Sequence, residues 1–155
     1  MKKLLVTAVT LAATFITGSA LATEKQAIQE KTATSPLLVM VTSDDAQVQL
    51  MSMVLTMQSA QQGAKTQVLL CGPAGDMALR DAPQSVTSSQ PPKGLSAQGL
   101  MQAVMQKTNT KVEVCAVYLP GKGLDRDALI EGVGVADPAD IAKLMIDKET
   151  NIVSF

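Results

Sequence analysis

Short apolar runs alternate with longer segments of helical periodicity from Pro36 to the end of the chain. Three runs, residues 36–42, 65–71 and 111–117, are rich in apolar and β-branched residues and predict buried strands. The first of them is apolar on both faces, as is typical of a covered parallel sheet. Two shorter runs, 132–136 and 151–155, follow the same pattern. The alternation predicts a single three-layer α/β/α domain with a mainly parallel sheet of about five strands.

Polar residues mark where the predicted helices begin. Ser43-Asp44-Asp45 supplies N-cap chemistry for a helix over 46–62, and Thr42 with Asp45 fits the spacing of a capping box. Ser96 is expected to cap a helix that ends near Thr108, and Asp137-Pro138 opens a last one. Between Gly72 and Gly94 turn residues predominate, with a short helical turn expected at Asp76–Leu79 and a long loop from Ala82 to Lys93.

The first 22 residues have the three parts of a secretory signal peptide. Lys2 and Lys3 precede an uncharged apolar run, which leads to Ala20-Leu21-Ala22. A transmembrane anchor is the alternative, but the run is shorter than the ~20 residues that a span needs. We therefore expect cleavage after Ala22, a flexible leader over 23–35, a domain over 36–155 and a periplasmic or secreted protein, without a membrane contact once the signal is removed.

Composition excludes several classes of function. The chain has no His and one Tyr, and 13 basic residues stand against 14 acidic ones. The absence of His removes the commonest general base and the commonest metal ligand, so hydrolysis by a serine triad or by zinc is not expected. No basic patch with interleaved aromatic residues is present, which argues against nucleic acid as a partner. We expect neither a cofactor nor a metal.

The two cysteines are the candidate reactive groups. Cys71 ends the second predicted strand and Cys115 lies near the end of the third, so both belong to the sheet edge where ligands collect in α/β folds. In an oxidising compartment two cysteines usually form a disulfide, which here would contribute about 4 kcal/mol. The alternative is a nucleophilic Cys115 thiol, whose pKa a nearby Lys122 would lower. A buried, inert Cys115 remains a third interpretation.

Nine methionines allow one other hypothesis. Met51, Met53 and Met57, together with the cysteines, are soft ligands suited to Cu(I) in an exported protein. They spread over more than one face of the predicted helix, and methionines at helical spacing more often fill a core. We rank copper binding below the thiol hypothesis.

With these features the chain resembles the DsrE/DsrF-like family of small sulfur-relay proteins, in its exported single-domain branch. The resemblance covers residues 36–155 and includes the segments Leu69–Ala74 and Val112–Val117. It implies a flavodoxin-like sheet, assembly into homo-oligomers such as trimers or hexamers, and a cysteine after the third strand that carries persulfide sulfur, a position that Cys115 matches. It thereby implies a sulfurtransferase-like role with a sulfur donor and acceptor as partners. Candidate residues around the acceptor are Thr42, Ser43, Cys71, Tyr118 and Lys122.

Two hypotheses follow. In the first, Cys115 accepts sulfane sulfur as a persulfide and passes it on; in the second, the protein is a non-catalytic oligomeric binding module. A flavodoxin-like strand order of 2-1-3 would place the first strand between the two cysteine-bearing strands. On that order we expect the Cα atoms of Cys71 and Cys115 to lie beyond disulfide reach, with Cys115 the closer of the two to the Thr42–Asp45 turn.

Overall fold

The computed structural model describes residues 36–155; the predicted signal peptide and leader lie outside the described residues. Five parallel strands form one sheet in the order β4-β3-β2-β1-β5. The strands are β1 (Pro36–Val41), β2 (Lys65–Leu70), β3 (Lys111–Val114), β4 (Gly134–Val135) and β5 (Asn151–Ser154). The helical segments are α2 (Ala46–Gln61), η1 (Gly72–Ala78), α3 (Gln84–Thr87), α4 (Ala97–Lys107), α5 (Tyr118–Lys122), η2 (Arg126–Ala128) and α6 (Pro138–Ile146). The predicted α/β class and the five parallel strands are confirmed.

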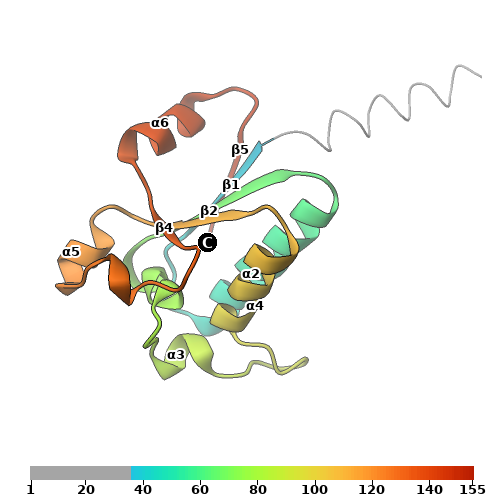
Figure 1. The fold of residues 1–155 in the computed structure, drawn as a ribbon. Helices are drawn as coiled ribbons and strands as arrows, with labels where there is room; N and C mark the ends of the chain where they lie inside the picture. The colour runs from blue at the N-terminus through green and yellow to red at the C-terminus, as the bar shows by residue number, and fades with distance from the viewer. Residues whose placement is uncertain (1–35) are drawn as a thin grey trace, which may run out of the picture.

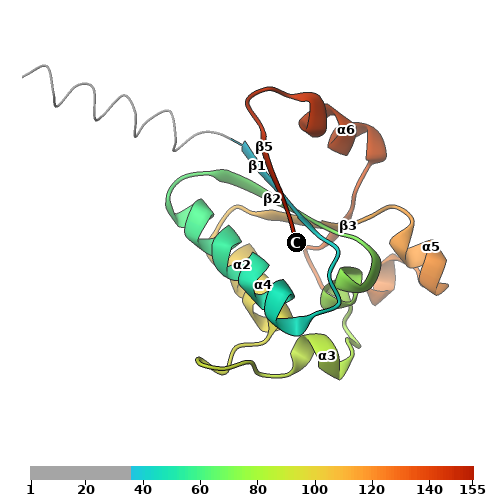
Figure 2. The ribbon, with the colours of Figure 1, turned by 180° about the vertical axis from the view of Figure 1, so that it is seen from behind.

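The strand order that we expected is wrong. We expected β1 to lie between β2 and β3, whereas in the structure β2 lies between β1 and β3. The chain steps from β1 to β2 and then to β3 in one direction, and the crossover helices α2 and α4 pack together (Figure 1). Right-handed crossovers taken in one direction put their helices on one face of a sheet, and a reversal puts the next helix on the other face. The last crossover runs from β4 back to β5, and α6 accordingly lies on the opposite face (Figure 2).

The two faces of the sheet carry cores of unequal size. The larger core contains Val39, Val68 and Val112 from the strands, with Met53 of α2 and Met101 of α4. On the other face Leu38 and Leu69 pack with Ile141 of α6 in a small cluster. Within the described residues no helix is long and apolar enough to cross a membrane.

The caps follow the sequence closely. Asp45 Oδ1 accepts the amides of Gln47 and Val48, each at 2.9 Å, so Asp45 is the N-cap of α2. Ser96 and Asp137 cap α4 and α6 as predicted. The capping box that we expected from Thr42 does not form.

Helix α2 has an unusual distribution of polar side chains. Gln49, Ser52 and Thr56 are buried, and the two hydroxyls are satisfied by carbonyls of the same helix: Ser52 donates to Gln49 O and Thr56 to Ser52 O, both at 2.7 Å. The outward positions Val48, Met51 and Leu55 are apolar and exposed, and α2 contains no charged residue. The outer side of α2 is therefore an apolar stripe, which we call the α2 stripe (Val48, Met51 and Leu55).

A polar group occupies the α6 face of the sheet over β2 and β3. The Glu113 carboxylate is buried, accepts the Gln67 amide at 2.8 Å and forms an ion pair with Lys111 at 2.8 Å. Gly134 of β4 leaves room for this side chain, because a Cβ there would come within 3.2 Å of Glu113 Cγ. The charge of the buried Glu113 is thus compensated by Lys111, whose own side chain stays largely exposed.

The chain after β3 differs from expectation. The predicted strand to Val117 ends at Val114, and residues 118–122 form α5. The Tyr118 amide donates to the Cys115 carbonyl at 2.9 Å, which turns the chain immediately after the strand. Cys115 therefore stands at the strand end rather than within a strand.

Candidate functional site

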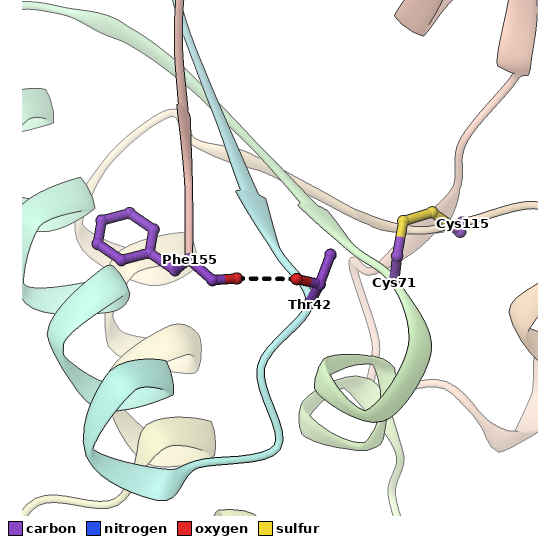
Figure 3. The surroundings of a disulfide bond; sticks show 4 residues. All are labelled: Thr42, Cys71, Cys115 and Phe155. Atoms are coloured by element: carbon purple, nitrogen blue, oxygen red, sulfur yellow. Dashed lines mark hydrogen bonds between the residues drawn. A yellow bond between two sulfur atoms is a disulfide. The ribbon is translucent and has the colours of Figure 1, made fainter.

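The two cysteines occupy equivalent positions at the carboxyl edge of the sheet. Strand β2 ends at Leu70 and β3 at Val114, and these two residues are register partners. Cys71 and Cys115 are the next residue on each strand, so the register continues through them. Their Cα atoms are 5.1 Å apart and their sulfur atoms are bonded (Figure 3).

Our expectation that the cysteines lie beyond disulfide reach is therefore wrong. Neighbouring strands lie ~4.8 Å apart, which is inside the range of Cα separations that a disulfide accepts. Had β1 separated the two strands, as we expected, the distance would be about twice as large. Strand order, together with the register between β2 and β3, decides whether this pair can bond.

Both cysteines are half-buried and lie on the α6 face. They pack against the small cluster of that face, which includes Leu69 and Ala136, and Cys115 also contacts the larger core. Neither cysteine is free in the structure. The nucleophile proposed from the sequence, Cys115, is thus present here in its oxidised form, and a thiolate requires reduction of the bond.

The turn after β1 lies beside Cys71 rather than Cys115. The Cys71 amide donates to Val41 O at 2.9 Å, so the expectation that Cys115 is the closer cysteine is wrong. Thr42 Oγ1 donates to Phe155 O at 3.0 Å (Figure 3), and Ser43 Oγ accepts the Asp45 amide at 3.1 Å. In this arrangement the Thr42 hydroxyl binds the backbone just after β5, and the Ser43 hydroxyl binds the backbone of its own turn.

Tyr118 and Lys122 converge on Asp76, a residue that the sequence analysis missed. The Tyr118 hydroxyl donates to Asp76 Oδ1 at 2.6 Å, and Lys122 Nζ lies 2.8 Å from the same oxygen. Lys122 Nζ also lies 5.8 Å from the centre of the Tyr118 ring, within the range of a cation–π contact. Lys122, which we expected to act on the Cys115 thiol, is thus paired with a carboxylate.

The Tyr118 phenol is strongly biased toward its protonated form. Burial raises its pKa above the ordinary value of 10.0, and the hydrogen bond to Asp76 and the negative charge of that carboxylate raise the pKa further. The ring lies so close to Gly75 that a Cβ at that position would overlap it. A lone Asp in a Gly-rich turn gives no signal in the sequence, which is why Asp76 was not singled out.

Metal binding has little support among the described residues. No group of three or more His, Cys, Asp or Glu side chains is placed there to hold an ion. Met53 and Met57 are buried whereas Met51 is exposed, so these methionines do not converge as a ligand set.

A hollow of about 770 Å³ exists at the amino edge of the sheet, lined by residues such as Lys65, Thr66 and Lys107, but neither cysteine lines it.

Comparison with solved structures identifies the fold. The domain is similar to the YchN protein of E. coli, with a TM-score of 0.61 and 18% identity over 79% of this chain and 99% of that one. It is also similar to MTH1491 of Methanobacterium thermoautotrophicum, a protein of unknown function, with a TM-score of 0.57 and 17% identity over 78% of this chain and 99% of that one. The fold is DsrE-like. No protein-family model matches the chain, and no curated protein matches it in sequence.

Proposed function

We propose that this protein accepts sulfane sulfur as a persulfide on Cys115 and relays it to a partner, once the disulfide has been reduced. The observation that carries the proposal is the placement of two half-buried cysteines, side by side, at the carboxyl ends of adjacent central strands. Ligands of α/β sheets collect at this edge. The choice of Cys115 as the acceptor rests on the DsrE/DsrF-like resemblance of its segment.

The chemistry needs only the thiolate and a donor that contains sulfane sulfur. With thiosulfate, the Cys115 thiolate attacks the outer sulfur, the sulfur–sulfur bond of the donor breaks, and sulfite leaves with the electron pair. Reduction of the Cys71–Cys115 bond must come first, and an external dithiol supplies the two electrons. The predicted export to an oxidising compartment makes such a reductant a required partner.

The second candidate function is a disulfide-stapled, oligomeric binding module. The bonded state of the cysteines favours it, because a structural disulfide would stabilise the domain without any chemistry. A second copy of the chain is the partner we propose for the α2 stripe, since α2 presents apolar side chains and no charge that a symmetric contact would oppose. The homo-oligomer expected from the sequence remains a prediction.

Intact mass spectrometry separates the two functions. Protein lacking residues 1–22 is reduced, freed of reductant and incubated with thiosulfate or inorganic polysulfide, and Cys71→Ser is treated in parallel so that no disulfide can form. A gain of one sulfur atom on Cys71→Ser, absent from the double variant with Cys115→Ser, supports sulfur acceptance. An unmodified Cys71→Ser protein would leave the binding module as the function.

A further inference from the structure

We infer that Cys71 resolves the Cys115 persulfide, expelling hydrosulfide and closing the Cys71–Cys115 disulfide. This inference rests on the proposed function, because Cys115 must first accept the sulfur. It adds a product and a role for the second cysteine: a persulfide that no acceptor collects is reduced to hydrosulfide by the protein itself.

The backbone hydrogen bonds of the sheet hold the two cysteine residues side by side, independently of the bond between their sulfur atoms. The Cys71 amide donates to Val41 O at 2.9 Å, and the Cys115 amide donates to Leu70 O at 2.8 Å. Each cysteine is therefore part of the hydrogen-bonded ladder of the sheet, and neither position depends on the disulfide. A Cα separation of 5.1 Å already lies within the ordinary range for a disulfide.

A second contact ties together the segments that follow the two cysteines. Segment η1 begins directly after Cys71, and α5 begins three residues after Cys115. Asp76 of η1 accepts the Tyr118 hydroxyl of α5 at 2.6 Å and pairs with Lys122 at 2.8 Å. Neither of these contacts involves a sulfur atom. We therefore expect both segments to stay docked when the disulfide is reduced.

The step balances without any further reagent. The Cys71 thiolate attacks the inner sulfur of Cys115–S–SH, the bond between the two sulfurs of the persulfide breaks, and hydrosulfide leaves with the electron pair and its hydrogen. The two thiols are oxidised to the disulfide, and the sulfane sulfur is reduced by two electrons. An external dithiol then restores the two thiols, which returns the site to its starting state.

The resolving step is intramolecular, and the fold holds its two reacting residues in position. Reacting groups that are held in position avoid the entropic cost of a bimolecular encounter, and their effective concentration far exceeds that of a thiol in solution. The closure rate is therefore expected to be independent of protein concentration. In the wild-type protein an acceptor collects the sulfur only if it reacts faster than Cys71 does.

The test follows sulfur and mass together after reduction and removal of the reductant. Thiosulfate is added to wild-type protein and to Cys71→Ser, and hydrosulfide is measured against a blank containing donor alone. Because thiosulfate loses sulfite when it gives up its outer sulfur, hydrosulfide above the blank comes only from the resolving step. We expect wild type to release one equivalent of hydrosulfide per chain and to show the mass of the disulfide form. Cys71→Ser is expected to keep one extra sulfur atom and to release no hydrosulfide above the blank.

The outcomes distinguish this inference from the proposed function. If Cys71→Ser takes up no sulfur, the proposed function fails and the inference fails with it. If Cys71→Ser takes up sulfur but wild type also keeps its adduct without forming the disulfide, only the inference is overturned. Closure whose rate rises with protein concentration would also overturn it. Cys71→Ala replaces Cys71→Ser should the serine variant fail to fold.

A positioning variant tests the tie between η1 and α5. Tyr118→Phe removes the hydroxyl that binds Asp76 but keeps the ring against Gly75. In the presence of both cysteines we expect the persulfide to persist longer before closure. The rate of sulfur uptake is measured separately in the Cys71→Ser background, with and without Tyr118→Phe, so that closure is compared after uptake has been accounted for. An unchanged closure rate would remove Tyr118 from the resolving step.

Discussion

Reduction of the Cys71–Cys115 bond should lower the free energy of unfolding by about 4 kcal/mol. The two cysteines are separated by 44 residues in the chain, and a crosslink that closes a loop of this length removes that much chain entropy from the unfolded state. In the native state the same strands are held by the hydrogen-bonded ladder between β2 and β3, so bond cleavage is expected to leave the fold intact. The effect therefore lies in the unfolded chain.

The measurement is thermal unfolding of one protein in its two oxidation states. For a domain of this size the loss corresponds to a fall in Tm of roughly 12 to 24 °C on reduction. The double variant Cys71→Ala/Cys115→Ala is the control, because the reductant should not change its Tm. A difference below about 1 kcal/mol between oxidised and reduced wild type would refute the entropic reasoning.

Two other predictions concern features away from the sulfur atoms. Tyr118 is the only tyrosine, so its near-ultraviolet tyrosinate absorbance reports one group, and it should ionise well above pH 10 in the folded protein. Because its pKa is raised on folding, the stability it contributes is present below pH 10 and is lost as the pH rises through the folded pKa; an ordinary titration near 10 would contradict this. Leu55→Lys should weaken self-association in sedimentation at micromolar concentration, whereas Gln61→Lys, at an exposed position near the end of the same helix, should not. A wild-type monomer at that concentration would remove the proposed interface.

The local chemistry of the sequence made the individual helices and strands predictable, but it did not determine the order of the strands in the sheet. The caps of Asp45, Ser96 and Asp137 and the stop at Gly63, which has a positive φ of 94°, are local features that the sequence displays. Strand order depends on how whole crossovers pack, and crossovers of similar length are compatible with several orders.

The wrong strand order also led to the wrong expectation about the two cysteines. Both cysteines were assigned to the correct edge, but their relation depended on which strand lies between them. Asp76 was missed for a related reason: its role comes from Tyr118 and Lys122, more than 40 positions away, which share its corner only in the fold. Residue types identified the two cysteines as the candidate site, and topology decided their neighbours.

The buried carboxylate of Glu113 limits which surfaces can pack against the α6 face of the domain. Any apolar layer laid over β2 and β3 on the α6 face would have to strip water from Lys111, whose charge compensates Glu113. Removing a charge from water costs several kcal/mol, which a flat contact seldom returns. A contact on the α2 stripe avoids this desolvation cost, because α2 contains no charged residue. The α2 side and the α6 side of the domain therefore differ in the contacts they favour, and the buried Glu113 of β3 is a cause of that difference.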